Sequence, residues 1–215
     1  MLPVLTGSLP YLLKGAVVTL TLSAAVVGLG TLLGVALGIL ATTRSRLAGS
    51  FVTGYIFVLR GIPVLVVMFL GYYAFPAFGL RVSAYAAVGL AQIVYVGAFV
   101  AEITRSAILA VPAGQIAAAR SLGMRRAAIL SQVILPQAAR IAIPPLLNSA
   151  LTAVKQTSYA SVVGVWELTY AAREVVERTL AAFQIFLGVM AIYFLICYPL
   201  SLAARWSERR LAFAH

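Results

Sequence analysis

An uncharged run from Gly15 to Thr43 is the feature that most limits what this chain can fold into. A helix needs about 20 apolar residues to cross a hydrocarbon core of about 30 Å, and this run is longer than that. It therefore predicts a membrane-spanning helix. A signal peptide does not explain it, because the run is too long and the only basic residue before it is Lys14. Within the run, Gly30, Gly34 and Gly38 recur every fourth residue and predict close packing against another helix.

Further apolar stretches follow, and together they indicate the class of protein. Hydrophobic residues make up 63% of the chain and charged residues 10%, which is far from the balance of a soluble domain. No linker rich in Pro, Ser or Gly divides the sequence. We therefore expect an all-α integral membrane protein, a single domain over residues 1–215 with five transmembrane helices. The expected spans are 15–43, 55–80, 82–105, 141–166 and 179–204.

Composition also excludes several functions. The formal charge is +11, but the basic residues stand in clusters between apolar runs, so membrane orientation explains them better than nucleic acid does. The chain has no aspartate, one histidine, His215, and one cysteine, Cys197. A zinc site or a Ser-His-Asp arrangement lacks its residues, so no metal or cofactor is expected, and a membrane enzyme is a weak alternative. Neither Lys14 nor Lys155 follows a phosphate-binding loop, which excludes ATP binding by that route.

The basic residues are unevenly divided between the two ends of the expected spans. Five spans place the two termini on opposite sides of the membrane. Because cytoplasmic loops carry the excess of Lys and Arg, we expect the C-terminus inside and the N-terminus outside. The expected cytoplasmic residues are Arg44, Arg46, Arg105, Arg120, Arg125, Arg126, Arg140, Arg205, Arg209 and Arg210. The expected outer residues are Lys14, Arg81, Arg173 and Arg178.

One long segment, 111–139, is soluble in character although membrane spans flank it on both sides. Pro112 suits a first helical turn and Gly123 a helix end, which predicts a short helix over Gln115 to Leu122. Its small residues at 117–119 let another backbone approach, and Leu122 supplies an apolar anchor, so the helix fits a groove. An amphipathic connector lying on the bilayer is the alternative. Pro136 should bend or end the second helix of the segment.

The order AGQIAAARSLGM, followed by ILPQA, closely resembles the cytoplasmic EAA loop of ABC-importer permeases, in particular the branch for polar amino acids and opines. The residues in register are Gly114, Gln115, Ala118, Ala119, Leu122, Gly123, Ile134, Leu135, Pro136 and Gln137. Ala117 departs, because the family usually has glutamate there. The resemblance implies a coupling helix seated in a cleft of an ATP-hydrolysing subunit. The implied contact residues are Gly114, Gln115, Ala117, Ala118, Ala119, Arg120, Leu122 and Gly123.

This resemblance also implies an assembly. A five-helix permease of the type I importer fold would pair with an identical or homologous permease in the bacterial plasma (inner) membrane. Two ABC ATPase subunits would supply the energy, and an extracytoplasmic binding protein would deliver an amino acid or an amino-acid derivative. The lipid bilayer is the remaining partner, and no nucleic acid is expected. A stand-alone channel or membrane scaffold without ATPase coupling is the alternative.

The expected fourth span carries polar residues that are costly in a membrane. Counted from Ile141, Lys155 lies about 21 Å into a helix, and Gln156, Thr157, Ser158 and Tyr159 follow it. Such groups are tolerated where they face protein or water, so we interpret them as part of a translocation path. The element resembles the family's K-D-T-S-L, with Gln156 and Tyr159 as departures. The alternative is a kinked helix end from which Lys155 reaches the surface.

Other polar residues are assigned by their places in the expected spans. Gln92 and Tyr95 are candidates for the path, although a tyrosine also serves as a packing residue. A solute carboxylate would meet Lys155, and its ammonium would meet the ring of Tyr95 or Tyr159. Three more residues are interpreted as structural, each in an element that resembles the family. They are Arg60, expected near the cytoplasmic face, and the pair Glu102 and Arg105 at the inner end of the third span.

Overall fold

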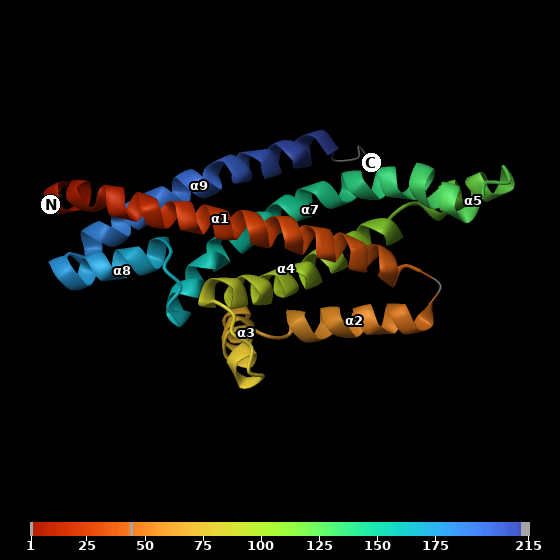
Figure 1. Cartoon of the computed structure of the whole chain (residues 1–215). Helices are drawn as coiled ribbons and strands as arrows, with labels where there is room; N and C mark the ends of the chain where they lie inside the picture. Colours follow the sequence, from red (N-terminus) through yellow and green to blue (C-terminus); the bar gives the residue numbers. More distant parts are fainter. Residues whose placement is uncertain (1, 44, 212–215) are drawn as a thin grey trace.

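The computed structural model describes residues 2–43 and 45–211, and all the regular structure within them is helical (Figure 1). Arg44 and His215, both considered above, lie outside the described residues. The elements are α1 (Leu2–Ala41), α2 (Arg46–Arg60), α3 (Val64–Ala77), α4 (Ala84–Leu109), α5 (Ala113–Ser121), α6 (Arg126–Ala128), the π-helix η1 (Ile129–Ile134), α7 (Leu135–Gln156), the 3-10 helix η2 (Thr157–Val163), α8 (Leu168–Thr179) and α9 (Ala182–Leu211). The prediction of an all-α protein is confirmed.

Length and apolar character single out the helices that can cross a membrane. In the described part of the chain these are Val4–Ala41, Ala84–Leu109, Arg126–Val163 and Ala182–Leu211, with α2 and α3 as a bent pair that passes the same test together. The molecule thus has four candidate spans, or five if the bent pair counts as one. Four of these helices extend several residues beyond the predicted spans. Helix α1 begins before residue 15, the helix Arg126–Val163 begins before residue 141, and α4 and α9 continue past residues 105 and 204.

The long helices α1, α4, α7 and α9 run along a common bundle, and α2 lies alongside it against α1 and α4 (Figure 1). At one end of the bundle lies α5, which follows α4. At the opposite end lies α8, close to the start of α1. The two ends of the described chain also lie toward opposite ends of the bundle, as an odd number of spans requires.

Close packing between α1 and α4 confirms the interpretation of the glycine series. A Cβ atom added at Gly34 would lie 2.4 Å from Val100 Cβ, and one at Gly38 would lie 2.5 Å from Thr104 Cβ. Only glycine lets the two backbones approach this closely. Helix α1 begins at Leu2 and not near residue 15, so with a rise of 1.5 Å per residue it is about 60 Å long.

The span predicted over 55–80 is not one helix. Helix α2 ends at Arg60 and α3 starts at Val64, and their axes differ by 106°. Pro63 is the physical reason, since it has no N–H to continue the α2 hydrogen bonds and it disfavours helical backbone at the residue before it. Helix α3 is only about 21 Å long, too short to cross the core by itself.

Pro136 does not end the helix before the fourth span, contrary to the prediction. The chain passes from α6 through the wide turns of η1 directly into α7, where Pro136 occupies the first turn. A first-turn residue needs no N–H donor, so the proline is accommodated there. The continuous helix therefore starts at Arg126, well before the predicted start at residue 141. At its far end the chain tightens into η2 and stops at Gly164, whose φ of 81° ends the helix.

Four apolar clusters hold the described part of the bundle together. The largest joins α1, α3, α4 and η2 and includes Leu22, Met68 and Val88. The second lies at the end of the bundle near α8 and joins α1, α8 and α9 through Leu12, Leu168 and Ile185, all fully buried. At the other end, the third packs the end of α4 and Val111 against the start of α7, and the fourth packs α2 against α4.

Candidate functional site

Helix α5 presents most of its surface to solvent at the end of the bundle (Figure 1). Pro112 precedes it, and Gly123, with a φ of 74°, turns the chain after it, as the sequence predicts. Leu122 is 82% exposed, an unusual position for a leucine that has no partner to cover it. The residues that are exposed here are Gly114, Gln115, Ala117, Ala118, Arg120, Leu122 and Gly123. Ala119 is different, because it is buried against the chain's own body.

A pair of amides ties α5 to the start of α7. Gln137 Nε2 donates to Gln115 Oε1 at 2.6 Å and also to the carbonyl oxygen of Val133 at 2.8 Å. Val133 belongs to η1, whose wider turns displace its carbonyl from ordinary α-helical pairing. The two glutamines of the loop sequence, which are 22 residues apart, thus meet in one contact. A sequence pattern gives both residues but not their contact.

A hollow of about 300 Å³ lies between α4 and α7. Of the residues predicted for the solute path, Tyr95 and Gln156 line it. The sequence reasoning missed the rest of its lining, namely Val96, Phe99, Ile103, Pro145, Asn148, Ser149 and Thr152. A signal for the polar ones was present, since Asn148, Thr152 and Gln156 are spaced by four and form one stripe on a helix.

Gln92, Thr157 and Ser158 turn away from this hollow. Gln92 is fully buried and donates to the carbonyl oxygen of Ala153 at 3.1 Å, which joins α4 to α7. Thr157 is also fully buried and donates to Val154 O at 2.7 Å, and Ser158 donates to Lys155 O at 2.8 Å. These hydroxyls satisfy backbone carbonyls where α7 passes into η2, which is a structural task.

Lys155 lies on a different face of α7 from the hollow. It lines a groove of about 410 Å³ between α7 and α9, together with Cys197, Tyr198 and Arg205. Successive residues on a helix point about 100° apart, so Lys155 and Gln156 face different neighbours. The structure therefore does not bring Lys155 together with Tyr95. Tyr159 is 43% exposed and lines neither cavity.

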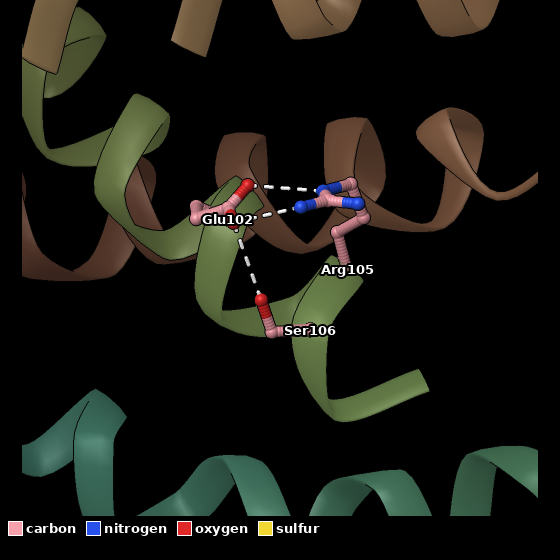
Figure 2. Close-up of polar contacts among 3 residues, drawn as sticks. All are labelled: Glu102, Arg105 and Ser106. Carbon is pink, nitrogen blue, oxygen red and sulfur yellow. Dashed lines mark hydrogen bonds and ion pairs between the residues drawn. The ribbon is translucent and has the colours of Figure 1, made fainter. Parts of the chain in front are cut away.

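Glu102 and Arg105 form a two-point ion pair on α4 (Figure 2). Arg105 donates from Nε at 3.0 Å and from Nη2 at 2.8 Å, and Ser106 Oγ donates to the same carboxylate at 3.3 Å. The fork geometry uses the planar guanidinium fully, which agrees with a structural role. Both side chains are only partly exposed.

Arg60 ends α2 at the break before α3, and its Cζ lies 5.6 Å from the centre of the Phe99 ring. Phe99 is about 15 Å along α4 from the end of that helix at Leu109. Arg60 therefore lies beside α4 about this far from the end of that helix, and its place near the cytoplasmic face stays a prediction. Because Phe99 also lines the hollow, Arg60 stands beside it.

The opposite end of the bundle holds a buried acid that sequence reasoning missed. Glu167 is fully buried and accepts hydrogen bonds from the backbone N–H of Tyr170 at 2.9 Å, from Tyr193 Oη at 3.1 Å and from Thr19 Oγ1 at 3.2 Å. It thereby caps α8 and joins it to α1 and α9. Burial raises the pKa of the Glu167 carboxyl, although these hydrogen bonds oppose the shift. The mixed charge of the segment had indicated only an outer location.

A second acid of α8 is placed differently. Glu174 accepts hydrogen bonds from Tyr11 Oη and, at 2.9 Å, from Trp166 Nε1. The Tyr11 hydroxyl is the main cause that lowers the pKa of the Glu174 carboxyl. Arg178 lies over the ring of Tyr11 at 5.9 Å, so aromatic and charged groups together hold the start of α1 against α8.

Comparison with known proteins identifies a matching family and several relatives of this chain. The family model described as "Binding-protein-dependent transport system inner membrane component" matches residues 30–213. The probable glutamine ABC transporter permease protein GlnM of Bacillus subtilis (strain 168) is 37% identical over 193 residues, which are 89% of each chain. The L-cystine transport system permease protein TcyB of the same organism is 41% identical over 158 residues, 73% of this chain and 68% of that one. The glutamine transport system permease protein GlnP of Escherichia coli (strain K12) is 34% identical, with 95% and 94% covered.

Solved structures show the same relationship. A chain from the crystal structure of an amino acid ABC transporter with histidines superimposes with a TM-score of 0.89 at 33% identity, covering 96% of both chains. A chain of the inward-facing MetNI methionine ABC transporter superimposes with a TM-score of 0.77 at 19% identity, covering 95% of this chain and 97% of that one. The second likeness concerns the fold alone.

Proposed function

The chain belongs to the family of binding-protein-dependent transport system inner membrane components, and on this premise we propose which solute it carries and how its residues move it. It is the multi-pass permease subunit of an ABC importer in the inner membrane. Its partners are ATPase subunits, a second permease subunit and a solute-binding protein. This membership disfavours the stand-alone channel or scaffold that the sequence left open.

The proposed solute is an amino acid or an amino-acid derivative. Support comes from relatives that are named for glutamine, cystine, nopaline and octopine, all of which combine an ammonium or guanidinium group with a carboxylate. The hollow between α4 and α7 adds physical support, since a mostly apolar wall with a few amide and hydroxyl groups is usual for a small-molecule site. We place the solute path there, with Tyr95 and Gln156 in its wall. Thr157 and Ser158 hold the backbone at the junction of α7 and η2, and Gln92 joins α4 to α7. Lys155 and Tyr159 do not line this hollow, so we leave them out of the proposed path.

The observation that carries the coupling mechanism is the exposed surface of α5 at one end of the bundle. We propose that this helix seats in a cleft of an ATPase subunit, with Leu122 as its apolar anchor and Ala117 and Ala118 allowing close approach. ATP hydrolysis then takes place in the partner, and this chain contributes no catalytic residue. The buried Ala119 supports α5 from below and does not contact the ATPase.

Motion of α5 reaches the solute path through η1 and α7. The bond between Gln115 and Gln137 makes the two helices move together, and α7 carries Asn148, Thr152 and Gln156. Closure of the ATPase subunits would shift α7 against α4 and open the hollow to one side of the membrane at a time. For this to be import, α5 and the C-terminus lie in the cytoplasm and the N-terminus outside. The arginines at 120, 125, 126, 209 and 210 support that orientation.

Replacement of Ala118 by glutamate tests the docking of α5. The larger charged side chain should prevent close approach, so the permease should reach the membrane normally while co-purifying poorly with its ATPase and losing most uptake. Ala127, which is also exposed but lies outside α5, gives the matched control Ala127→Glu. Normal uptake and normal ATPase recovery in Ala118→Glu would refute the docking role of this helix.

A further inference from the structure

The hollow between α4 and α7 supplies only half of what an amino-acid zwitterion needs. The rings of Tyr95 and Phe99, whose centres lie 5.0 Å apart, offer π faces for an ammonium group. The amide and hydroxyl groups of Asn148, Thr152 and Gln156 can hydrogen-bond an uncharged side chain. None of the residues that line the hollow is a cation. A solute carboxylate must therefore find its counter-charge just beyond the lining.

Two of the nearby cations are unsuited to this task. Lys155 opens into the groove between α7 and α9, on another face of the helix. Arg105 is already engaged, because both of its contacts to Glu102 use the guanidinium fork (Figure 2). Releasing it would leave a carboxylate in the bundle without a partner, which is costly.

Arg60 meets the requirement. Its guanidinium lies 5.6 Å from the centre of the Phe99 ring, and that ring is part of the wall of the hollow. The side chain is exposed, and in the described part of the chain the one ion pair is that of Glu102 with Arg105, so Arg60 has no acid bound to it. Its charge does reach Glu102, but that carboxylate is already neutralised by Arg105. The group of three thus has one positive charge in excess.

We propose that Arg60 binds the carboxylate of the solute at the edge of this hollow, while the ring of Tyr95 receives its ammonium group, because the Phe99 ring already carries the Arg60 guanidinium. The ligand class is an α-amino acid zwitterion with an uncharged polar side chain. Such a ligand balances the excess charge, and a guanidinium presents two parallel donors to a carboxylate. This inference rests on the function proposed above and assigns the counter-charge to a residue that the sequence alone indicated as structural.

The break between α2 and α3 adds a reason for the position of Arg60. The last residue of α2 is freed from a straight helix by Gly61 and Pro63, so its side chain is held at the corner of a 106° bend. A cation in a long apolar helix would have to reach an interface to be solvated. At this corner the Arg60 guanidinium lies over the Phe99 ring, which forms part of the wall of the hollow.

The test uses the intact complex with its ATPase subunits. It measures how much more strongly each variant binds a ligand with a free carboxylate than the same ligand without one. Ligand-induced thermal stabilisation is measured with L-glutamine and with its α-carboxamide, which lacks the charge, in the absence of binding protein. Uptake of L-glutamine, L-cystine and nopaline into proteoliposomes is measured with binding protein present. The variants are Arg60→Gln, Arg60→Lys and the control Lys155→Gln, each compared with the unaltered chain.

We expect the unaltered complex to bind the acid at least about tenfold better than the amide, the range of a charge-assisted hydrogen bond. In Arg60→Gln this preference should fall below about twofold, with the unliganded melting temperature unchanged, and Arg60→Lys should keep part of it. Lys155→Gln should keep all of it. A purely structural role for Arg60 would weaken binding of the acid and of the amide equally. The inference is therefore overturned if Arg60→Gln keeps the full preference for the acid over the amide. It is also overturned if Lys155→Gln loses this preference. If the unaltered complex takes up none of these solutes, the amino-acid proposal itself fails first.

Discussion

Gln137 and Gln115 are joined by a hydrogen bond of 2.6 Å that bridges the short helix at the end of the bundle and the long helix that borders the hollow. The same Gln137 amide also holds the Val133 carbonyl at 2.8 Å, so one side chain fixes both α5 and η1. A rigid connection of this kind transmits displacement, whereas a flexible loop would absorb it.

Replacing Gln137 by methionine should uncouple hydrolysis from uptake. Methionine has a similar length but cannot donate, so the bond to Gln115 is lost at a cost of about 0.5–1.5 kcal/mol. We expect ATPase subunits to co-purify normally, with solute uptake per ATP hydrolysed reduced several-fold. Gln132, which is exposed in η1, provides the control Gln132→Met. An unchanged ratio of solute uptake to ATP hydrolysis in Gln137→Met would show that motion of the ATPase subunits reaches the solute path through other contacts.

Restoring glutamate at position 117 should leave the permease functional. Ala117 is exposed, and its side chain has room to grow on the surface of α5. Because the family usually has glutamate here, we expect Ala117→Glu to bind the ATPase at least as tightly as the unaltered chain, in contrast to Ala118→Glu. Co-purification yields and uptake rates of both variants make the comparison. Equal damage by both substitutions would show that α5 does not dock in the orientation proposed.

A side chain at Gly34 should disrupt the packing of α1 on α4. The first added carbon would lie 2.4 Å from Val100 Cβ and 2.7 Å from the carbonyl oxygen of Gly97, so a backbone must move. Overpacking of this kind costs about 1–3 kcal/mol, and we expect Gly34→Leu to lower the melting temperature of the purified protein by several degrees. Gly28→Leu, which meets nothing within 4 Å, is the control. Similar melting temperatures for the two variants would contradict the packing.

Glu167 should make the stability of the protein depend on pH. Its carboxyl pKa is raised above the ordinary value of 4.5 by burial, so the folded state holds the proton more tightly than the unfolded state. The stability from this difference is complete below pH 4.5 and is lost as the pH rises through the raised folded pKa. Glu167→Gln is neutral at every pH and should lack this loss.

The measurement is the melting temperature of the unaltered chain and of Glu167→Gln as the pH is raised from 4.5. The difference between the unaltered chain and Glu167→Gln should move in favour of the glutamine variant as the pH rises. Glu177→Gln, an exposed change on the same helix, should run parallel to the unaltered chain. Parallel curves for Glu167→Gln as well would indicate that the hydrogen bonds to the Glu167 carboxylate cancel the effect of burial on its pKa.

Local sequence rules predicted the features that depend on a few neighbouring residues. The end of α5 at Gly123 follows from its left-handed backbone, and the contact of α1 with another helix follows from Gly34 and Gly38. The span expected over 55–80 is broken at Pro63, but the 106° bend depends on what α3 packs against and so could not be read from the sequence. Pro136 was misjudged because its effect depends on whether it falls in the first turn of a helix or inside one.

The candidate site was predictable only in part for a related reason. The sequence identified polar residues near the end of the fourth span. Which of them are buried, and whether each side chain points toward α4 or α9, depends on how α7 is rotated between those two helices. Tyr95 and Gln156 share one hollow, whereas Lys155 faces another groove. Glu167 carried no signal at all, because nothing in its sequence neighbourhood marks it as a buried cap.

The wide turn that precedes Pro136 has one further consequence. An extra residue per turn in η1 changes the angular setting of everything downstream, and each residue on a helix corresponds to about 100° of rotation. If that segment were one residue shorter, Ser149, Ala153 and Thr157 would take the places of Asn148, Thr152 and Gln156 beside Tyr95, and the hollow would lose both of its amide groups. The length of η1 thus decides which polar groups of α7 reach the interior passage.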